Sequence, residues 1–289
     1  MTLLRRLRPE GQPSDGEVTP LTLATALRLR PSLVGRFTSE MIAEHVEAFP
    51  DLAFGVARQN QYGIGGLWRR RDDIGEVVEV TRGPYRQAIL RRLLDAFDTR
   101  GVTLVVLDFE ESGGNASFYA SEGFATIDRI VEYERQIQPP ARQVQATPVR
   151  AYQPGDFAAV VEVDHASFPW LWWNSEAELD AYLHTPGVEI FVSLGPDGRP
   201  VGYAGLTIRG TFAHLDRLAV HERHQRRGHG ATLLTFVLDE MRAIGIRRIA
   251  LSTQEDNYRS QALYERYGFT RGRWSYDIRG IWLREPISD

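Results

Sequence analysis

The chain has 289 residues, of which 43% are hydrophobic and 25% charged, and its formal net charge at pH 7 is −4. It contains no cysteine, which excludes disulfides, thiolate metal sites and a cysteine nucleophile. It also contains no lysine, so all 34 lysine-or-arginine residues are arginine and a Schiff-base lysine is excluded. The negative net charge gives no support to a nucleic-acid partner, because such partners usually require a basic domain.

The length predicts roughly two domains. No apolar run approaches the roughly 20 residues that span a bilayer, and the start of the chain lacks the apolar core of a signal peptide. We therefore expect a cytoplasmic protein without a membrane partner.

Hydrophobic periodicity predicts a similar order of elements in the two halves of the chain. In the first half, strands are expected at residues 3–7, 54–58, 63–68, 76–80 and 102–109, and helices at residues 19–29, 37–48 and 86–98. In the second half, strands are expected at residues 149–152, 190–194, 201–209, 214–220, 246–252 and 271–283, and helices at residues 154–165 and 231–244.

The two halves also end alike. Tyr119 and Phe124 have the same spacing as Tyr264 and Phe269, at an offset of 145 residues. This internal repeat predicts two copies of one α/β fold. The expected domains are residues 1–137 and 149–289, joined by a proline- and glutamine-rich linker at residues 138–148.

The most informative stretch joins the strand at residues 214–220 to the helix at residues 231–244. The intervening loop is basic and contains Gly228 and Gly230. A helix start leaves backbone N–H groups without partners and carries the positive end of the helix dipole, and glycines let a ligand approach the backbone. The stretch therefore predicts a bound anion such as a pyrophosphate.

Two common phosphate motifs do not fit this loop. The P-loop requires a lysine, which the chain lacks, and the dinucleotide fingerprint requires a third glycine where Leu233 stands. Instead, Gln225, Gly228 and Gly230 match the pattern Gln/Arg-x-x-Gly-x-Gly/Ala. Further along the chain, a second ordered pattern, Asn-x-x-Ala/Ser-x-x-Leu-Tyr-x-x-x-Gly-Phe, is matched by Asn257, Ser260, Leu263, Tyr264, Gly268 and Phe269.

Together the two patterns resemble those of the GNAT superfamily of acyl-CoA-dependent N-acetyltransferases. The resemblance implies two GNAT-fold domains, each a mixed, mostly antiparallel twisted sheet flanked by helices. It implies acetyl-CoA as cosubstrate, no metal, and direct attack of the acceptor in a ternary complex. The cofactor-binding residues that it implies are Leu218, Ala219, Val220, Gln225, Arg226, Arg227, Gly228, His229, Gly230, Ala231 and Asn257.

The resemblance also implies catalytic residues. Tyr264 stands where the family has its general acid toward the CoA thiolate; the alternative is a tyrosine of the core. His214 stands where some members have a catalytic glutamate, and imidazole can accept a proton from an ammonium group. Asp216 lies two residues further along the strand, so both side chains share one face. Ordered water is the alternative base.

Three tryptophans, Trp170, Trp172 and Trp173, fall in the segment that borders the acceptor in GNAT-like folds. They are predicted to line the acceptor pocket, and the alternative is that they pack between the two copies. The stretch from His221 to His224 misses the zinc pattern His-Glu-x-x-His by one residue, so a solvated basic loop is the preferred interpretation.

The first copy lacks the features of the phosphate loop. Under the same offset Gly83 corresponds to Gly228, but Tyr85 replaces Gly230, and Pro84 removes a backbone N–H. We expect that the first copy does not bind the cofactor.

The resulting hypothesis is an acetyl-CoA-dependent N-acetyltransferase that acts on a primary amine of a small molecule. The two-copy arrangement resembles that of mycothiol synthases, although no motif ties the acceptor to their substrate. A non-catalytic acyl-CoA-binding module and a protein N-acetyltransferase are the alternatives. The identity of the acceptor and the formation of a homodimer stay open.

Overall fold

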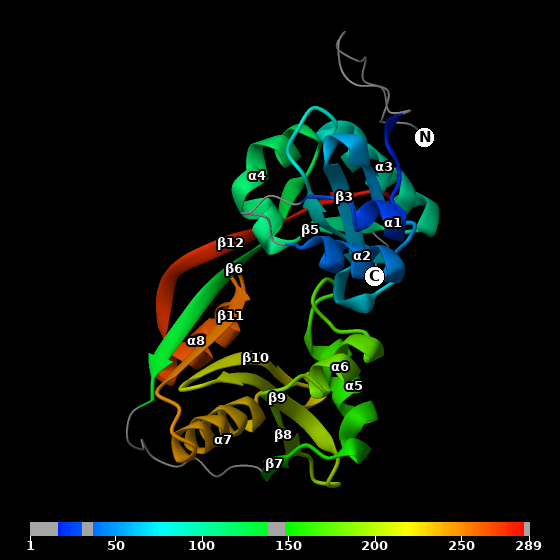
Figure 1. Ribbon diagram of the computed structural model, residues 1–289. Helices are drawn as coiled ribbons and strands as arrows, with labels where there is room; N and C mark the ends of the chain where they lie inside the picture. The colour runs from blue at the N-terminus through cyan, green and yellow to red at the C-terminus, as the bar shows by residue number, and fades with distance from the viewer. Residues whose placement is uncertain (1–16, 31–36, 138–147, 286–289) are drawn as a thin grey trace. The chain divides into compact units, whose positions relative to one another are not determined.

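The computed structural model describes residues 17–30, 37–137 and 148–285 (Figure 1). The strand expected at residues 3–7 and most of the expected linker lie outside these ranges. The chain forms two compact units, one of Met1–Ile127 with Asp277–Asp289 and one of Asp128–Tyr276. Within the described ranges, no helix is both long enough and apolar enough to cross a membrane.

The first unit is a mixed sheet with helices packed on it. Its elements are β1 (Thr19–Pro20), α1 (Leu23–Ala26), α2 (Ser39–Ala48), β2 (Ala53–Val56), β3 (Gln61–Leu67), β4 (Ile74–Val80), α3 (Arg86–Arg100), β5 (Leu104–Leu107) and α4 (Phe109–Ser121). The strand order is β1-β2-β3-β4-β5, followed by the last residues of β12 (Thr270–Trp282). Only β4 and β5 run parallel among the described pairs.

The second unit repeats this plan. Its elements are β6 (Ala125–Gln136), β7 (Val149–Ala151), α5 (Phe157–Ser167), α6 (Glu176–Leu183), β8 (Val188–Leu194), β9 (Pro200–Arg209), β10 (Phe212–Val220), α7 (His229–Ala243), β11 (Arg248–Gln254) and α8 (Tyr258–Arg266), with the start of β12. The strand order is β12-β6-β11-β10-β9-β8-β7. Helices α7 and α8 pack on one face of this sheet, and α5 and α6 pack on the other.

The predicted α/β class and the mostly antiparallel mixed sheet are confirmed. Several elements differ from expectation. The helix expected at residues 19–29 is a four-residue helix, and the Thr22 side chain caps its start at Leu23. The segment 271–283 forms one long strand, β12, and α4 begins where the strand at 102–109 was expected to end.

The two units differ from the expected domains at residues 1–137 and 149–289. Strand β6 follows the first copy along the chain but pairs antiparallel with β11, with Tyr133 opposite Leu251. Strand β12 follows the second copy, yet its end pairs antiparallel with β5, with Ile281 opposite Val105. Each copy therefore receives its last strand from the other, which moves the boundaries to 127/128 and 276/277.

The core of the second unit depends on β6. Tyr133 is buried against Tyr264 of α8, with ring centroids 6.2 Å apart. Its hydroxyl donates to Glu265 at 3.0 Å and to Gln261 at 3.2 Å, the two acceptors lying on α8. Val131, from the same strand, belongs to the same core. This strand was not predicted, because its outward face is charged and its partner is distant in sequence.

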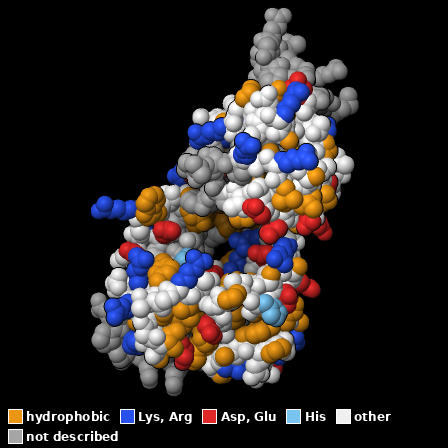
Figure 2. All heavy atoms as spheres, in the orientation of Figure 1, with side chains coloured by type: hydrophobic (Ala, Val, Ile, Leu, Met, Phe, Trp, Pro, Cys, Tyr) orange, Lys and Arg blue, Asp and Glu red, His pale blue; other side chains and the backbone are white. Residues whose placement is uncertain are grey.

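The surface of the molecule mixes the two signs of charge. On the face drawn in Figure 2, blue arginine and red acidic side chains are interspersed among apolar ones. This distribution agrees with the small negative net charge of the sequence.

The strand exchange predicts how the chain can be divided. We expect a fragment of residues 128–276 to unfold cooperatively in urea, because it contains the whole second unit. A fragment of residues 149–276 lacks β6 and its buried Tyr133, so we expect no cooperative transition. Circular dichroism during urea titration measures both. Equal cooperativity of the two fragments would contradict the assignment of β6 to the second unit.

Candidate functional site

A bulge in β10 at Asp216 sets the geometry of the site. Leu215 lies opposite Leu206 of β9, but Arg217 lies opposite Gly205, so Asp216 is one extra residue. Before the bulge, Leu215 faces the core beneath α7; after it, Ala219 faces the core beneath α5 and α6. The bulge therefore turns the end of the strand over, and Leu218 and Val220 now face α7.

The same bulge separates β10 from β11. The two strands pair in parallel only from Phe212 to Leu215, although β11 continues to Gln254. Beyond Leu215, the edge of β10 that faces β11 has no strand partner among the residues that the structure describes. Its backbone N–H and C=O groups are thus placed to pair with an extended ligand that carries amides.

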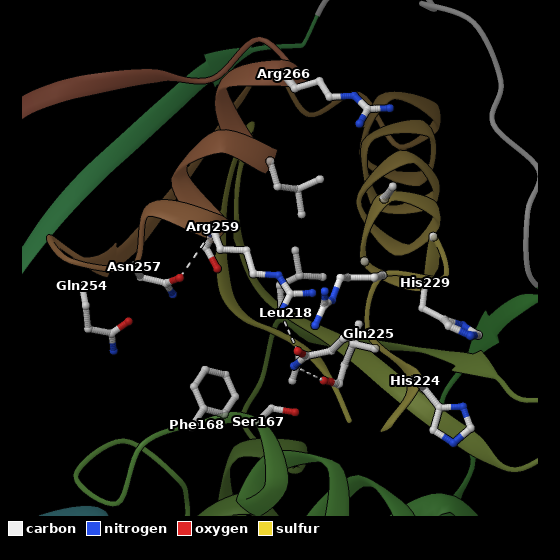
Figure 3. A pocket seen from close by; sticks show the side chains of 18 of the residues that line it. Ser167, Phe168, Leu218, His224, Gln225, His229, Gln254, Asn257, Arg259 and Arg266 are labelled. Atoms are coloured by element: carbon white, nitrogen blue, oxygen red, sulfur yellow. Dashed lines mark hydrogen bonds between the residues drawn. The ribbon is translucent and has the colours of Figure 1, made fainter. Parts of the chain in front are cut away.

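A cavity of about 550 Å³ opens at this divergence (Figure 3). It is lined by the end of β10, the following loop, the start of α7, and α8, with the end of α5 opposite. All of the predicted cofactor residues except Arg227 line it, namely Leu218, Ala219, Val220, Gln225, Arg226, Gly228, His229, Gly230, Ala231 and Asn257. The structure therefore brings this predicted set together around one cavity.

The start of α7 is suited to bind an anion. Its N-cap, Gly228, has a φ of 93° and provides no side-chain cap, and the first turn contains no acidic residue. The first intrahelical hydrogen bond runs from the Thr232 N–H to the Gly228 carbonyl at 2.9 Å. The N–H groups before Thr232 therefore have no acceptor within the helix. Arg226, with a φ of 60°, brings a positive charge to the same turn. These features favour phosphate oxygens.

Gln225 ties the loop that follows β10 to the end of β10 and to α8. Its amide Nε2 donates to the Val220 carbonyl at 2.9 Å, and its Oε1 accepts a hydrogen bond from Arg259. Figure 3 shows the hydrogen bond between Gln225 and Arg259 as a dashed line. The glutamine of the motif therefore acts in this structure by positioning the loop.

Gly230 leaves room for a ligand. A Cβ at this position would lie 3.7 Å from Leu263 and 3.7 Å from Val220, which are ordinary contacts. The fold itself therefore does not require glycine here, whereas Gly228 requires it because of its positive φ.

His214 and Asp216 form a hydrogen-bonded pair, with Nδ1 of His214 2.7 Å from Asp216 Oδ1. Asp216 also accepts from the Tyr182 hydroxyl at 2.7 Å and from the Thr207 hydroxyl at 2.6 Å. Burial and the nearby Asp216 charge raise the pKa of Tyr182, so its hydroxyl remains a donor. The carboxylate is thus held by three donors, and Nε2 of the 34% exposed His214 side chain is left to accept a proton.

Tyr264 lies behind the cavity wall, where it is 6% exposed and packs 6.0 Å from the ring of Phe269. Burial raises the pKa of Tyr264 to about 12, and a hydrogen bond with Ser260 opposes this shift. Ser260 and Leu263, from the same helix, line the cavity. Asn257 caps this helix, since its side chain accepts from the Ser260 N–H at 3.2 Å.

The three predicted acceptor tryptophans are placed differently from one another, and none lines this cavity. Trp172 is 9% exposed and its indole N–H donates to Asp128 at 2.6 Å. The ring of Trp173 lies 4.3 Å from that of His165, and Trp170 is half-buried. The segment contributes Phe168 and Pro169 to the wall instead.

A buried ion pair holds this segment, and it was not predicted. Arg217, next to the bulge, is paired with the fully buried Asp164 of α5. Its Nη1 donates to the Trp172 carbonyl at 2.9 Å, and its guanidinium lies 3.8 Å from the centroid of Phe168. The hydroxyl of Tyr203 donates to the same Asp164 carboxylate. No local sequence signal could have identified a pair separated by 53 residues.

Other lining residues were also missed. Arg259 and Arg266 lie on α8, and their spacing of seven residues, which places both on one helical face, was the available signal. Ser167 Oγ and His224 Nδ1 are buried in the lining without a hydrogen-bond partner. Such orphaned atoms favour a site for a polar ligand.

The histidines of the loop are spread out. The rings of His221 and His224 lie 6.0 Å apart, and those of His224 and His229 lie 6.2 Å apart. His229 is buried with Nδ1 2.8 Å from Ser193 Oγ, and burial lowers its pKa. Among the described residues no group of three His, Cys, Asp or Glu side chains could hold a metal ion.

In the first unit, the side chain of Gln61 fills the turn that corresponds to the start of α7. The Tyr85 N–H, at the start of α3, donates to Gln61 Oε1 at 3.0 Å. The Gln61 amide also occupies the space beside Gly83 where a Cβ would lie. Gln61 is buried, so it takes the place that an anion would need.

Substitution by alanine is expected to lower the free energy of unfolding at Gly228 but not at Gly230. Gly228→Ala places a side chain at a φ of 93°, so we expect the free energy of unfolding to fall by about 1–2 kcal/mol. Gly230→Ala lies within a helix with room for Cβ, so we expect no loss. Urea denaturation of both variants measures this difference, and an equal loss in both would contradict it.

Comparisons with known proteins agree with this geometry. The model of the Acetyltransferase (GNAT) family matches residues 157–269. The mycothiol acetyltransferase of Acidimicrobium ferrooxidans is 28% identical over 171 residues, which cover 54% of this chain and 54% of that protein. The match therefore spans about half the length of this relative. A Bacillus subtilis protein, provisionally named a ribosomal protein bS18-alanine N-acetyltransferase, is 25% identical over 124 residues, covering 43% of this chain and 81% of that protein.

The fold is shared over nearly the whole chain with a solved structure. A GCN5-related N-acetyltransferase from Sphaerobacter thermophilus superimposes with a TM-score of 0.60 at 16% identity, covering 93% of this chain and 96% of that one. Both units of this chain therefore follow the architecture of that structure.

Proposed function

We propose that the second unit, in which residues 157–269 match the model of the Acetyltransferase (GNAT) family, transfers an acetyl group from acetyl-CoA to a primary amine. The family uses acetyl-CoA. The observation that carries the proposal is the coincidence of an anion-binding helix start and an unpaired strand edge in one cavity.

Two parts of acetyl-CoA match these two features. The start of α7, with Arg226, would hold the pyrophosphate. The open edge of β10 at Leu218 and Val220 would pair with the amides of the pantetheine arm, as an added strand does. The arm would then run toward the bulge, which brings the thioester near Asp216 and Ser260.

His214 is the proposed base. Its Nε2 would take the proton of the acceptor ammonium, and Asp216 would hold the ring and stabilise the imidazolium. Because three groups donate to Asp216, this carboxylate positions His214 and is not itself the base. The acetyl carbon then forms its bond with the amine nitrogen as its bond to sulfur breaks.

Tyr264 is the proposed partner of the departing thiolate. A phenol with a pKa of about 12 stays protonated at neutral pH, so it can donate a hydrogen bond to sulfur. An ordinary thiol has a pKa near 8.5, so complete transfer of the phenolic proton is uphill. The role proposed for Tyr264 is therefore to stabilise the thiolate by hydrogen bonding, with the final proton coming from solvent or the base.

For the acceptor, a small-molecule amine is the first proposal, supported by the name of the first relative, mycothiol acetyltransferase. An N-terminal amine of a protein is the second, favoured by the name of the Bacillus subtilis relative. A non-catalytic acyl-CoA-binding module would retain the cavity without turnover.

Calorimetric titration of acetyl-CoA tests the binding step. We expect one site per chain, because Gln61 fills the corresponding turn of the first unit. Gly230→Tyr should abolish binding, since the new ring enters the cavity beside Leu263. Gly155→Tyr is the matched control, since nothing lies within 4 Å of a Cβ there. Absence of binding to the wild-type protein would refute the proposed function, and two sites would refute the role of Gln61.

Turnover tests the base. With a panel of primary amines, and CoA release measured with a thiol reagent, we expect His214→Gln to lower kcat by about 10²–10⁴-fold. The KM for acetyl-CoA should stay the same, because His214 does not line the cofactor cavity. Asp216→Asn should lower kcat less and move the pH profile, as a positioning residue would. Unchanged kcat in His214→Gln would favour a water base.

A further inference from the structure

Helix α8 brings two arginines to the cavity beyond those of the phosphate loop. Arg259 and Arg266 both line it, and both are labelled in Figure 3. Seven residues of helix separate them, which is about 10 Å along the axis. Arg259 is tied to Gln225 near the start of α7, whereas Arg266 lies at the far end of α8.

These two arginines differ from many others in the second unit. Arg242 is paired with Asp239 at 2.6 Å, and Arg271 with Glu255 at 2.6 Å. Across the residues that the structure describes, neither Arg259 nor Arg266 forms an ion pair with a carboxylate. Asp256 is an acidic residue of the lining, but it stands ten positions before Arg266 in the chain. The cavity therefore holds more positive charge than its own carboxylates balance.

Between the two arginines, α8 presents Ser260 and the apolar Leu263 to the cavity. Leu263 lies between them on α8, and Ala231 and Gly230 of α7 line the same cavity. A Cβ on Gly230 would lie 3.7 Å from Leu263, so the two helices are close at this level. This part of the lining could hold a nucleobase and its ribose, with Arg259 at one end and Arg266 at the other.

We infer that Arg266 binds the phosphate on the 3′ position of the CoA ribose and so selects CoA over dephospho-CoA. This inference rests on the proposed function. The pyrophosphate is assigned to the start of α7 with Arg226, so the third phosphate of CoA is the anion that remains. Arginine is suited to it, because the guanidinium fork can bind two phosphate oxygens at once.

Titration with CoA and with dephospho-CoA, which lacks only the 3′-phosphate, tests this inference at fixed ionic strength. We expect the wild-type protein to prefer CoA by about 10- to 100-fold, as one charge-assisted contact allows. Arg266→Gln should weaken CoA to the level of dephospho-CoA and leave dephospho-CoA unchanged. Arg247→Gln is the control, because it removes the same charge from an exposed position outside the cavity.

The outcomes separate this inference from the proposed function. If neither ligand binds the wild-type protein, the proposed function fails. If both bind it equally, the function stands and the inference fails. Equal weakening of the two ligands in Arg266→Gln, or loss of the preference in Arg247→Gln, would also overturn it, because the arginine would then act through general charge. The preference should shrink as salt is raised, since both arginines are exposed.

Discussion

The divergence of β10 from β11 is the constraint on which the rest of the site depends. One extra residue at Asp216 ends the pairing and turns the strand over. As a consequence, His214 and Asp216 meet Tyr182 on the face beneath α6, while Leu218 faces α7 and the cavity. A single bulge thus places the proposed base and the proposed cofactor slot on opposite faces of one strand, within a few residues of each other.

The first unit keeps this strand geometry but not the phosphate turn. Ile64 of β3 pairs with Glu79 of β4, and the next residue, Gly65, pairs with Val77, so a bulge recurs in β4. The parallel pairing of β4 with β5 likewise ends at Val77. The difference lies in the turn, where Gln61 accepts a hydrogen bond from the Tyr85 N–H, a donor that a bound anion would need. The copies therefore diverged in the loop while the sheet was retained, which fits a structural role for the first unit.

Local requirements of the backbone could be predicted from the sequence, and distant pairings could not. The glycine at position 228 is required by its positive φ, and the residues that the motif spacing picked out line one cavity. Strand β6 escaped prediction because its charged outer face weakens the strand pattern and its partner β11 lies more than a hundred residues away. Likewise, Trp172 could not be placed without knowing that Asp128 accepts its indole N–H.

A buried ion pair joins β10 to the segment that contributes Phe168 and Pro169 to the wall of the cavity. Arg217 directly follows the bulge, and its buried pair with Asp164 carries a hydrogen bond to the Trp172 carbonyl. A buried charge without its partner is costly, so this pair holds the α5–α6 segment in one position relative to β10. Because Asp128 of β6 fixes the other end of Trp172, the wall also depends on the strand that follows the first copy. The position of this part of the cavity wall therefore depends on the strand exchange as well as on the ion pair.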